Sequence, residues 1–148
     1  MSPNLILYPT FAMFALTFGV LLYMRSRRFG AVRGGSADAA FYKLYEGQEP
    51  EELRVITRNF INLFEMPTLF YVVALMIHAT GQTTVWLVFW AWVYVALRYA
   101  HTFIHLTSNH VMARFGAYFA SSMVLALMWA SLLIQLLVSS EPVVGVVA

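Results

Sequence analysis

The stretch RNFINLFEMPTLF, residues 58–70, decides how this chain folds, because it places polar side chains inside an apolar segment. Arg58, Asn62 and Glu65 are spaced i, i+4 and i+7, which puts all three on one face of a helix. Arg54 extends that face by one turn. Ionisable groups in a membrane helix normally face the interior of a bundle or a wet cavity. We therefore predict a membrane helix with one polar face turned inward.

The composition around this stretch predicts an integral membrane protein. The chain has 148 residues, of which 61% are hydrophobic and 11% charged, and its mean hydropathy is +0.71. A soluble domain of this length could not bury so much apolar surface. Segments long enough to cross about 30 Å of hydrocarbon are expected at about 5–24, 56–80, 84–106 and 115–139. Because two of the three links are short, we predict an all-α, up-down four-helix bundle, with residues 1–148 as one domain.

The basic residues predict the orientation in the membrane. All nine lysines and arginines lie on the side shared by the first connection, about 25–53, and the third connection. Cytoplasmic loops are enriched in these residues. We therefore expect both termini outside the cytoplasm. The acidic run EGQEPEE, residues 46–52, leads into the second helix, and Pro50 to Glu52 suit its first turn.

A second polar face is expected on the third segment. Arg98, His101 and His105 are spaced i, i+3 and i+7. A buried glutamate needs a cation and a buried arginine needs an anion, so the simplest arrangement pairs Glu65 with Arg98. Pro67 lacks an N–H and leaves the Leu63 carbonyl without its helical donor. We expect the second helix to open at that point.

Two interpretations of these polar faces remain open. The polar residues either fix the helices in register, or line a pocket for a polar, anionic ligand that enters from the cytoplasm. A metal or haem site is not expected, since no second histidine pair or nearby carboxylate accompanies His101 and His105. The chain has no cysteine, which removes disulfides and cysteine-ligated metals. Nothing in the sequence predicts nucleic-acid binding.

The motifs on the second and third segments resemble those of one family. Arg58-x3-Asn62-x2-Glu65-x4-Phe70 is similar to the second-helix signature of MAPEG, the membrane-associated proteins in eicosanoid and glutathione metabolism. RYAHTFIHLTSNHVMAR, residues 98–114, resembles the third-helix stretch of the microsomal glutathione transferase and prostaglandin E synthase branch. There the pattern is Arg-x-x-His-Thr-x-x-Tyr, with an arginine nine residues later. The resemblance covers nearly the whole chain.

The resemblance implies a homotrimer that binds glutathione near the cytoplasmic face. Arg58 would contact a carboxylate of glutathione, Glu65 would take its ammonium group, and Asn62 would support the site. Arg114 would stabilise the thiolate as the catalytic residue. The remaining binding residues implied by the resemblance are Arg28, Arg98, His101 and His105. The protein would act as a glutathione transferase or peroxidase, which conjugates or reduces a lipophilic electrophile dissolved in the membrane.

The sequence departs from the branch at three contact positions. Thr57 replaces an arginine, Phe60 replaces a histidine, and His105 replaces the third-helix tyrosine. Since many bacterial members differ in this way, we expect a bacterial inner membrane protein. The alternative function is a non-catalytic accessory subunit of a larger membrane complex, built on the same scaffold. A small transporter is disfavoured by the absence of an inverted repeat.

Overall fold

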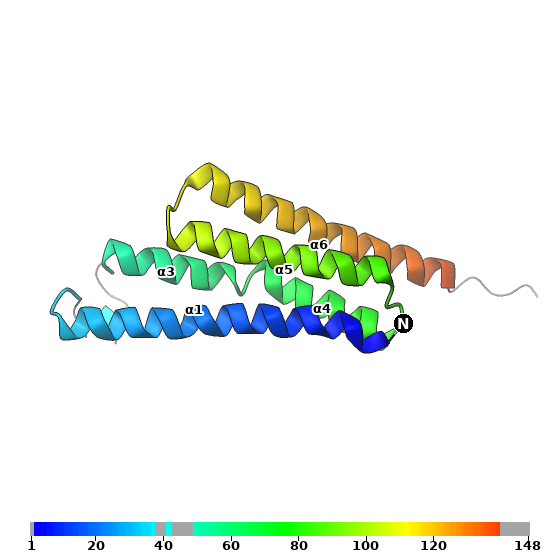
Figure 1. The fold of residues 1–148 in the computed structure, drawn as a ribbon, viewed down its shortest axis with the longest axis horizontal. Helices are drawn as coiled ribbons and strands as arrows, with labels where there is room; N and C mark the ends of the chain where they lie inside the picture. Colours follow the sequence, from blue (N-terminus) through cyan, green and yellow to red (C-terminus); the bar gives the residue numbers. More distant parts are fainter. Residues whose placement is uncertain (1, 38–40, 43–48, 140–148) are drawn as a thin grey trace, which may run out of the picture.

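The computed structural model describes residues 2–37, 41–42 and 49–139. The described part of the chain contains a short 3-10 helix, η1 (Pro3–Leu7), and five α-helices: α1 (Tyr8–Arg33), α3 (Glu51–Asn62), α4 (Met66–Ala79), α5 (Val85–Leu106) and α6 (Val111–Ser139). Because α3 and α4 together form one interrupted rod, these helices make four segments long and apolar enough to span a membrane. The helices run along one common direction, with α6 inclined to the rest (Figure 1). The predicted all-helical membrane bundle is confirmed.

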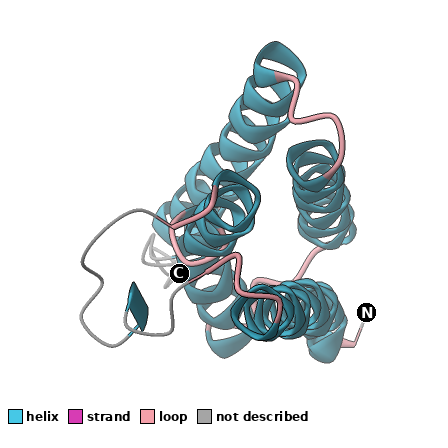
Figure 2. Cartoon of the chain, turned by 90° about the vertical axis from the view of Figure 1, so that its left-hand side faces the viewer, coloured by secondary structure: helices cyan, strands magenta, loops and turns pink. Residues whose placement is uncertain are grey.

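The helices enclose a core of apolar side chains near the middle of the bundle. Viewed from the end where α1 finishes, they are grouped around a common centre (Figure 2). The most extensive pairing is between α5 and α6. Phe70 of α4 stacks on Tyr94 of α5 with ring centroids 4.5 Å apart, and neither residue is exposed. This packing holds the interrupted second rod against α5.

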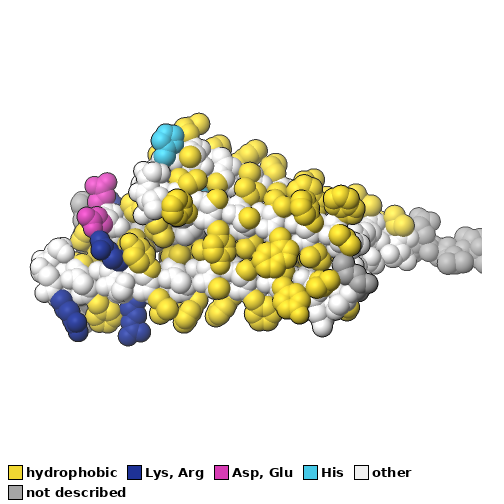
Figure 3. Space-filling view, viewed as in Figure 1, with side chains coloured by type: hydrophobic (Ala, Val, Ile, Leu, Met, Phe, Trp, Pro, Cys, Tyr) yellow, Lys and Arg dark blue, Asp and Glu magenta, His cyan; other side chains and the backbone are white. Residues whose placement is uncertain are grey.

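The outer surface matches a hydrocarbon environment. Large apolar side chains such as Phe11, Trp86 and Phe103 are each about two-thirds exposed or more. Hydrophobic side chains cover most of the face in Figure 3, while charged ones gather at the end where α1 finishes and α3 begins. The N-terminus and the end of α6 lie at the opposite end of the bundle (Figure 1). This charge distribution is that of a protein with one basic membrane face.

The first helix is longer than predicted. The expected connection at residue 25 is wrong, since α1 continues to Arg33. Arginine is a good helix former, and cations near a helix C-terminus interact favourably with its dipole. The helix ends where glycines allow it: Gly35 has φ +72°, and the Gly35 and Ser36 amides bond back to the Val32 and Ala31 carbonyls at 3.2 and 3.0 Å. This is a Schellman motif.

The other predicted boundaries shift by smaller amounts. The second rod begins at Glu51 instead of residue 56, because Pro50 is its N-cap and Glu51 and Glu52 occupy its first turn, as the acidic run predicted. The third helix begins after Thr84, whose hydroxyl accepts from the Leu87 amide at 3.3 Å. The fourth begins at Val111, four residues earlier than expected, which places Arg114 inside its first turn.

Candidate functional site

The second rod is broken where its polar residues gather. The helix stops at Asn62 and resumes at Met66, and Glu65 at the break has φ −84° and ψ −95°. The Leu63 amide still bonds to the Asn59 and Phe60 carbonyls, at 3.3 and 3.1 Å. Pro67 lies at the start of α4, where a missing N–H is tolerated. The opening predicted from Pro67 is therefore present.

A small polar pocket lies at this break. Its volume is about 270 Å³. The residues that line it come from α3, the break, α5 and α6: Arg58, Ile61, Asn62, Glu65, His105 and Arg114. Arg58, Asn62 and Glu65 lie together as predicted, although Glu65 lies in the break and not on the helix face. His105 and Arg114 complete the polar lining from across the bundle. Ile61 is an apolar neighbour that the polar pattern could not indicate.

The two opposite charges on the second rod remain available to a ligand. Within the described residues, neither the Arg58 nor the Glu65 side chain forms a hydrogen bond or an ion pair. Arg114 is held in place by the Asn109 side-chain oxygen, which accepts from its guanidinium. Asn109 adopts φ +48°, a left-handed conformation that asparagine tolerates better than most residues. The pocket thus presents two guanidinium groups and one carboxylate.

The two histidines of α5 differ in their surroundings. His105 lines the pocket, is only 2% exposed, and neither of its ring nitrogens has a partner among the described groups. His101 lies one turn away, outside the residues that line the pocket, with its ring edge-on to His105 at 5.6 Å. Its Nδ1 lies 3.0 Å from the Arg114 carbonyl oxygen. Since a carbonyl only accepts, Nδ1 donates and Nε2 is left as an acceptor.

The expected ion pair between Glu65 and Arg98 is wrong. No such pair forms between these two described residues. Arg98 is fully buried, and its Nη2 donates instead to the main-chain carbonyl of Asn62 at 2.9 Å. Its guanidinium carbon lies 5.4 Å from the centre of the Tyr118 ring. Arg98 therefore lies behind the pocket and does not line it.

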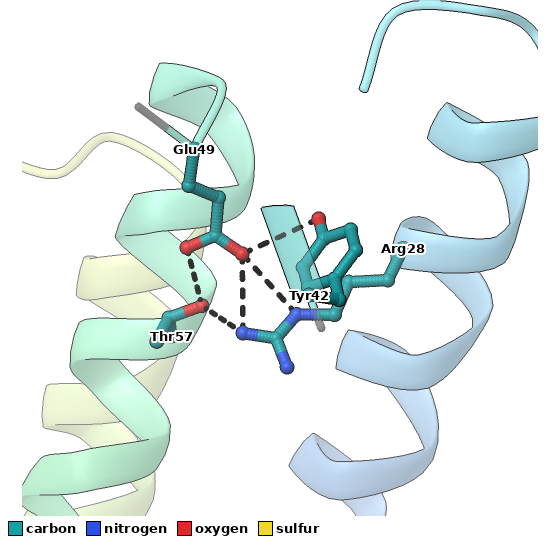
Figure 4. Close-up of polar contacts among 4 residues, drawn as sticks. All are labelled: Arg28, Tyr42, Glu49 and Thr57. Atoms are coloured by element: carbon teal, nitrogen blue, oxygen red, sulfur yellow. Dashed lines mark hydrogen bonds and ion pairs between the residues drawn. The ribbon is translucent and has the colours of Figure 1, made fainter. Parts of the chain in front are cut away.

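Arg28, the other cation implied by the resemblance, lies outside the residues that line the pocket. Its Nη2 lies 3.1 Å from Glu49 Oε1 and donates to the Thr57 hydroxyl at 2.9 Å (Figure 4). The Thr57 hydroxyl in turn donates to Glu49 Oε2 at 2.9 Å. Tyr42 lies beneath the guanidinium at 5.0 Å and donates to Glu49 at 3.5 Å. Burial and the charge of Glu49 raise the pKa of Tyr42. These four residues form a cluster that joins the end of α1 to the start of α3.

An apolar cavity lies on the α1 side of the same break. Its volume is about 410 Å³. Phe14, Phe18 and Leu21 of α1 face Leu63 and Phe64 of the break across it, with Thr17, Thr68 and Tyr71 completing the lining. The Thr17 hydroxyl donates to the Met13 carbonyl within α1, and the Thr68 hydroxyl donates to the Phe64 carbonyl in the break. This cavity is suited to a hydrocarbon group.

Comparison with known protein families identifies the scaffold. The MAPEG family profile matches residues 6–134, a range that includes every residue lining the polar pocket. The chain belongs to the MAPEG family. No curated protein and no solved structure matched the chain.

The three positions at which the sequence departs from the expected contact pattern, Thr57, Phe60 and His105, have different surroundings. In this MAPEG chain Thr57 belongs to the Arg28 cluster. Phe60 packs against Phe64 with ring centroids 5.0 Å apart and so supports the break. His105 remains in the pocket. Of these three residues, only His105 lines the pocket.

Proposed function

We propose that this MAPEG protein binds glutathione, or a closely similar thiol, in the polar pocket at the helix break. The observation that carries the proposal is that Arg58 and Arg114 share one pocket with the carboxylate of Glu65. Glutathione carries two carboxylates, one ammonium group and one thiol. Charge-assisted hydrogen bonds from guanidinium to carboxylate are strong and directional. The charges of pocket and ligand are complementary.

Each polar residue of the pocket has a role in this proposal. Arg58 binds a ligand carboxylate, Glu65 binds the ammonium group, and Asn62 supplies a further hydrogen bond. Arg114 lies beside the sulfur and favours the thiolate, since a nearby cation lowers the pKa of a thiol from its usual value of about 8.5. His105, with two unpartnered ring nitrogens, replaces the tyrosine contact of the transferase branch.

The second substrate in this proposal is a lipophilic electrophile. The thiolate attacks an electrophilic carbon, a C–S bond forms, and the leaving group departs with the bonding electrons. Positioning and activation of the nucleophile supply the catalysis. The apolar cavity beside the break supports a hydrocarbon partner. A MAPEG protein with this activity would belong with the microsomal glutathione transferase and prostaglandin E synthase branch.

The assembly and location are part of the same proposal. At about 270 Å³, the polar pocket is slightly smaller than the range of about 300–1,000 Å³ usual for ligand sites. It therefore accommodates part of a tripeptide, and a neighbouring subunit of a homotrimer would cover the rest. The trimer would lie in a bacterial inner membrane, with lipids around its apolar surface and both termini outside the cytoplasm.

Glutathione titration with matched variants tests the proposal. Calorimetry on the detergent-purified protein should show saturable binding that is lost in Glu65→Gln and Arg58→Ala. The controls are Glu52→Gln and Arg27→Ala, which remove an equivalent carboxylate and guanidinium from the exposed 3.0 Å pair between α1 and α3. These controls should bind like the wild type.

The opposite outcome would favour the other function. If wild-type protein does not bind glutathione at millimolar concentration, the thiol proposal is wrong. Co-purification with a defined membrane complex in mild detergent would then support an accessory subunit, in which the same polar residues stabilise the fold.

A further inference from the structure

The buried guanidinium of Arg98 lies directly behind the polar pocket. Arg98 projects from α5, has no exposed surface, and donates from Nη2 to the Asn62 carbonyl at 2.9 Å. Its Nε and Nη1 have no partner among the described residues. A buried cation in a membrane bundle needs a compensating negative charge. Among the described residues, the acceptor that its guanidinium binds is a main-chain carbonyl.

The helix break explains why that carbonyl is available. In a continuous helix the Asn62 carbonyl would accept from the Met66 amide four residues later. No bond joins these two described groups, because the chain turns at Leu63 to Glu65 before α4 begins. The last carbonyls of a helix lack intrahelical donors and carry partial negative charge. Arg98 therefore caps the C-terminal end of α3 from a neighbouring helix.

Asn62 connects this cap to the pocket. Asn62 lines the pocket, while its main-chain carbonyl accepts from Arg98 on the buried side. Glu65 lies three residues further on, at the N-cap of α4. A change in the end of α3 would therefore move both residues relative to Arg58, which lies one turn earlier on the same helix.

We propose that Arg98 is a positioning residue: by capping the end of α3 it holds the helix break open and orients Asn62 and Glu65 toward the ligand. The inference rests on the proposed glutathione site. In this inference Arg98 acts on the pocket without touching the ligand. Pro67 supports the same geometry, since its missing N–H keeps the break from closing.

Two variants test this inference: one removes the contact of Arg98 and the other closes the helix break. Arg98→Met removes the donor and keeps an unbranched apolar chain. Pro67→Ala restores an amide donor for the Leu63 carbonyl and favours a continuous helix. We expect each to misplace Asn62 and Glu65 and so to weaken glutathione binding by at least about tenfold. This is the usual effect of losing one charge-assisted hydrogen bond, here one to the ligand. Arg98→Lys, which keeps the charge and one donor, should recover most of the affinity lost in Arg98→Met.

A neighbouring residue provides a matched control. The Tyr99 hydroxyl, also on α5, donates to the Ala12 carbonyl at 2.9 Å, but this carbonyl belongs to the unbroken helix α1. Tyr99→Phe thus removes an interhelical bond of the same length without touching the break. It should leave glutathione affinity unchanged.

Hydrogen exchange separates positioning from general stability. In Arg98→Met, exchange should accelerate in peptides covering the break, residues 63–68, and stay unchanged in the middle of α6. Uniform acceleration across all helices, or unchanged affinity in both Arg98→Met and Pro67→Ala, would overturn the inference.

The failure of the proposed function gives a different result. If the wild type does not bind glutathione, the ligand assignment fails. Hydrogen exchange at the break alone then tests whether Arg98 caps the end of α3. Unchanged exchange there in Arg98→Met then refutes the cap as well. If Arg98→Met does not fold, unchanged affinity and unchanged exchange in Pro67→Ala would refute the role of the break.

Discussion

The Arg28 cluster predicts that two glutamates in one acidic run differ sharply in their effect on stability. The Glu49 side chain is 8% exposed and its partner Arg28 is 21% exposed, whereas Glu52 and Arg27 are 82% and 48% exposed. Glu49→Gln keeps the shape and one acceptor but removes the charge opposite the guanidinium. A hydrogen bond to a charged group contributes about 1.5–3 kcal/mol and a neutral one about 1 kcal/mol, and the substitution makes the bond from the Thr57 hydroxyl a neutral one. We therefore expect Glu49→Gln to lower the free energy of unfolding by about 1–2 kcal/mol.

Glu52→Gln is the matched control for this prediction. Exposed ion pairs contribute about 0.2–1 kcal/mol, so its effect should lie at or below the lower part of that range. Unfolding in mixed micelles with increasing sodium dodecyl sulfate, followed by helical circular dichroism, would measure both variants. If the two free energies of unfolding agree within about 0.5 kcal/mol, the cluster does not stabilise the junction of α1 and α3 as its contacts indicate.

Three further predictions concern the scaffold. Gly35→Ala should destabilise the end of α1 by about 1 kcal/mol, because Gly35 adopts φ +72° and other residues are strained there; hydrogen exchange at residues 31–37 would rise, and unchanged exchange would refute the Schellman assignment. Phe70→Ala removes a fully buried ring stacked on Tyr94 at 4.5 Å and should lower the free energy of unfolding by about 3–5 kcal/mol; a loss below about 1 kcal/mol would mean that the core closes without it. Thr84→Ala removes the N-cap of α5 and should lower the thermal midpoint, with a cost of about 0.5–2 kcal/mol; an unchanged midpoint would contradict the cap.

Local patterns allowed most of the membrane scaffold and half of the pocket to be predicted. The four segments follow from runs of apolar residues, which depend only on neighbours in sequence. The shared face of Arg58, Asn62 and Glu65 follows from helical periodicity, and Pro67 marks the break because a missing N–H acts locally. Hydropathy was less informative about helix ends, since α1 extends nine residues past its predicted end, through a basic stretch.

Tertiary partners could not be predicted from side-chain charge alone. Matching Arg98 with the nearest membrane carboxylate overlooked main-chain carbonyls, which become acceptors only where a helix ends. The partner of Arg28 was equally hidden, because the acidic run holds Glu46, Glu49, Glu51 and Glu52 and no local rule selects Glu49. The predicted roles of Arg58, Glu65 and Arg114 toward a ligand stay predictions until binding is measured.

One titration tests the central claim most directly. Glutathione would be added to the purified protein while calorimetry records binding and ultraviolet absorbance records the thiolate, in parallel for wild type, Glu65→Gln and Glu52→Gln. We predict saturable binding with a thiolate signal in wild type and Glu52→Gln, and neither in Glu65→Gln. Equal binding in all three proteins, or none in the wild type, would contradict the assignment of the pocket at the helix break as a glutathione site.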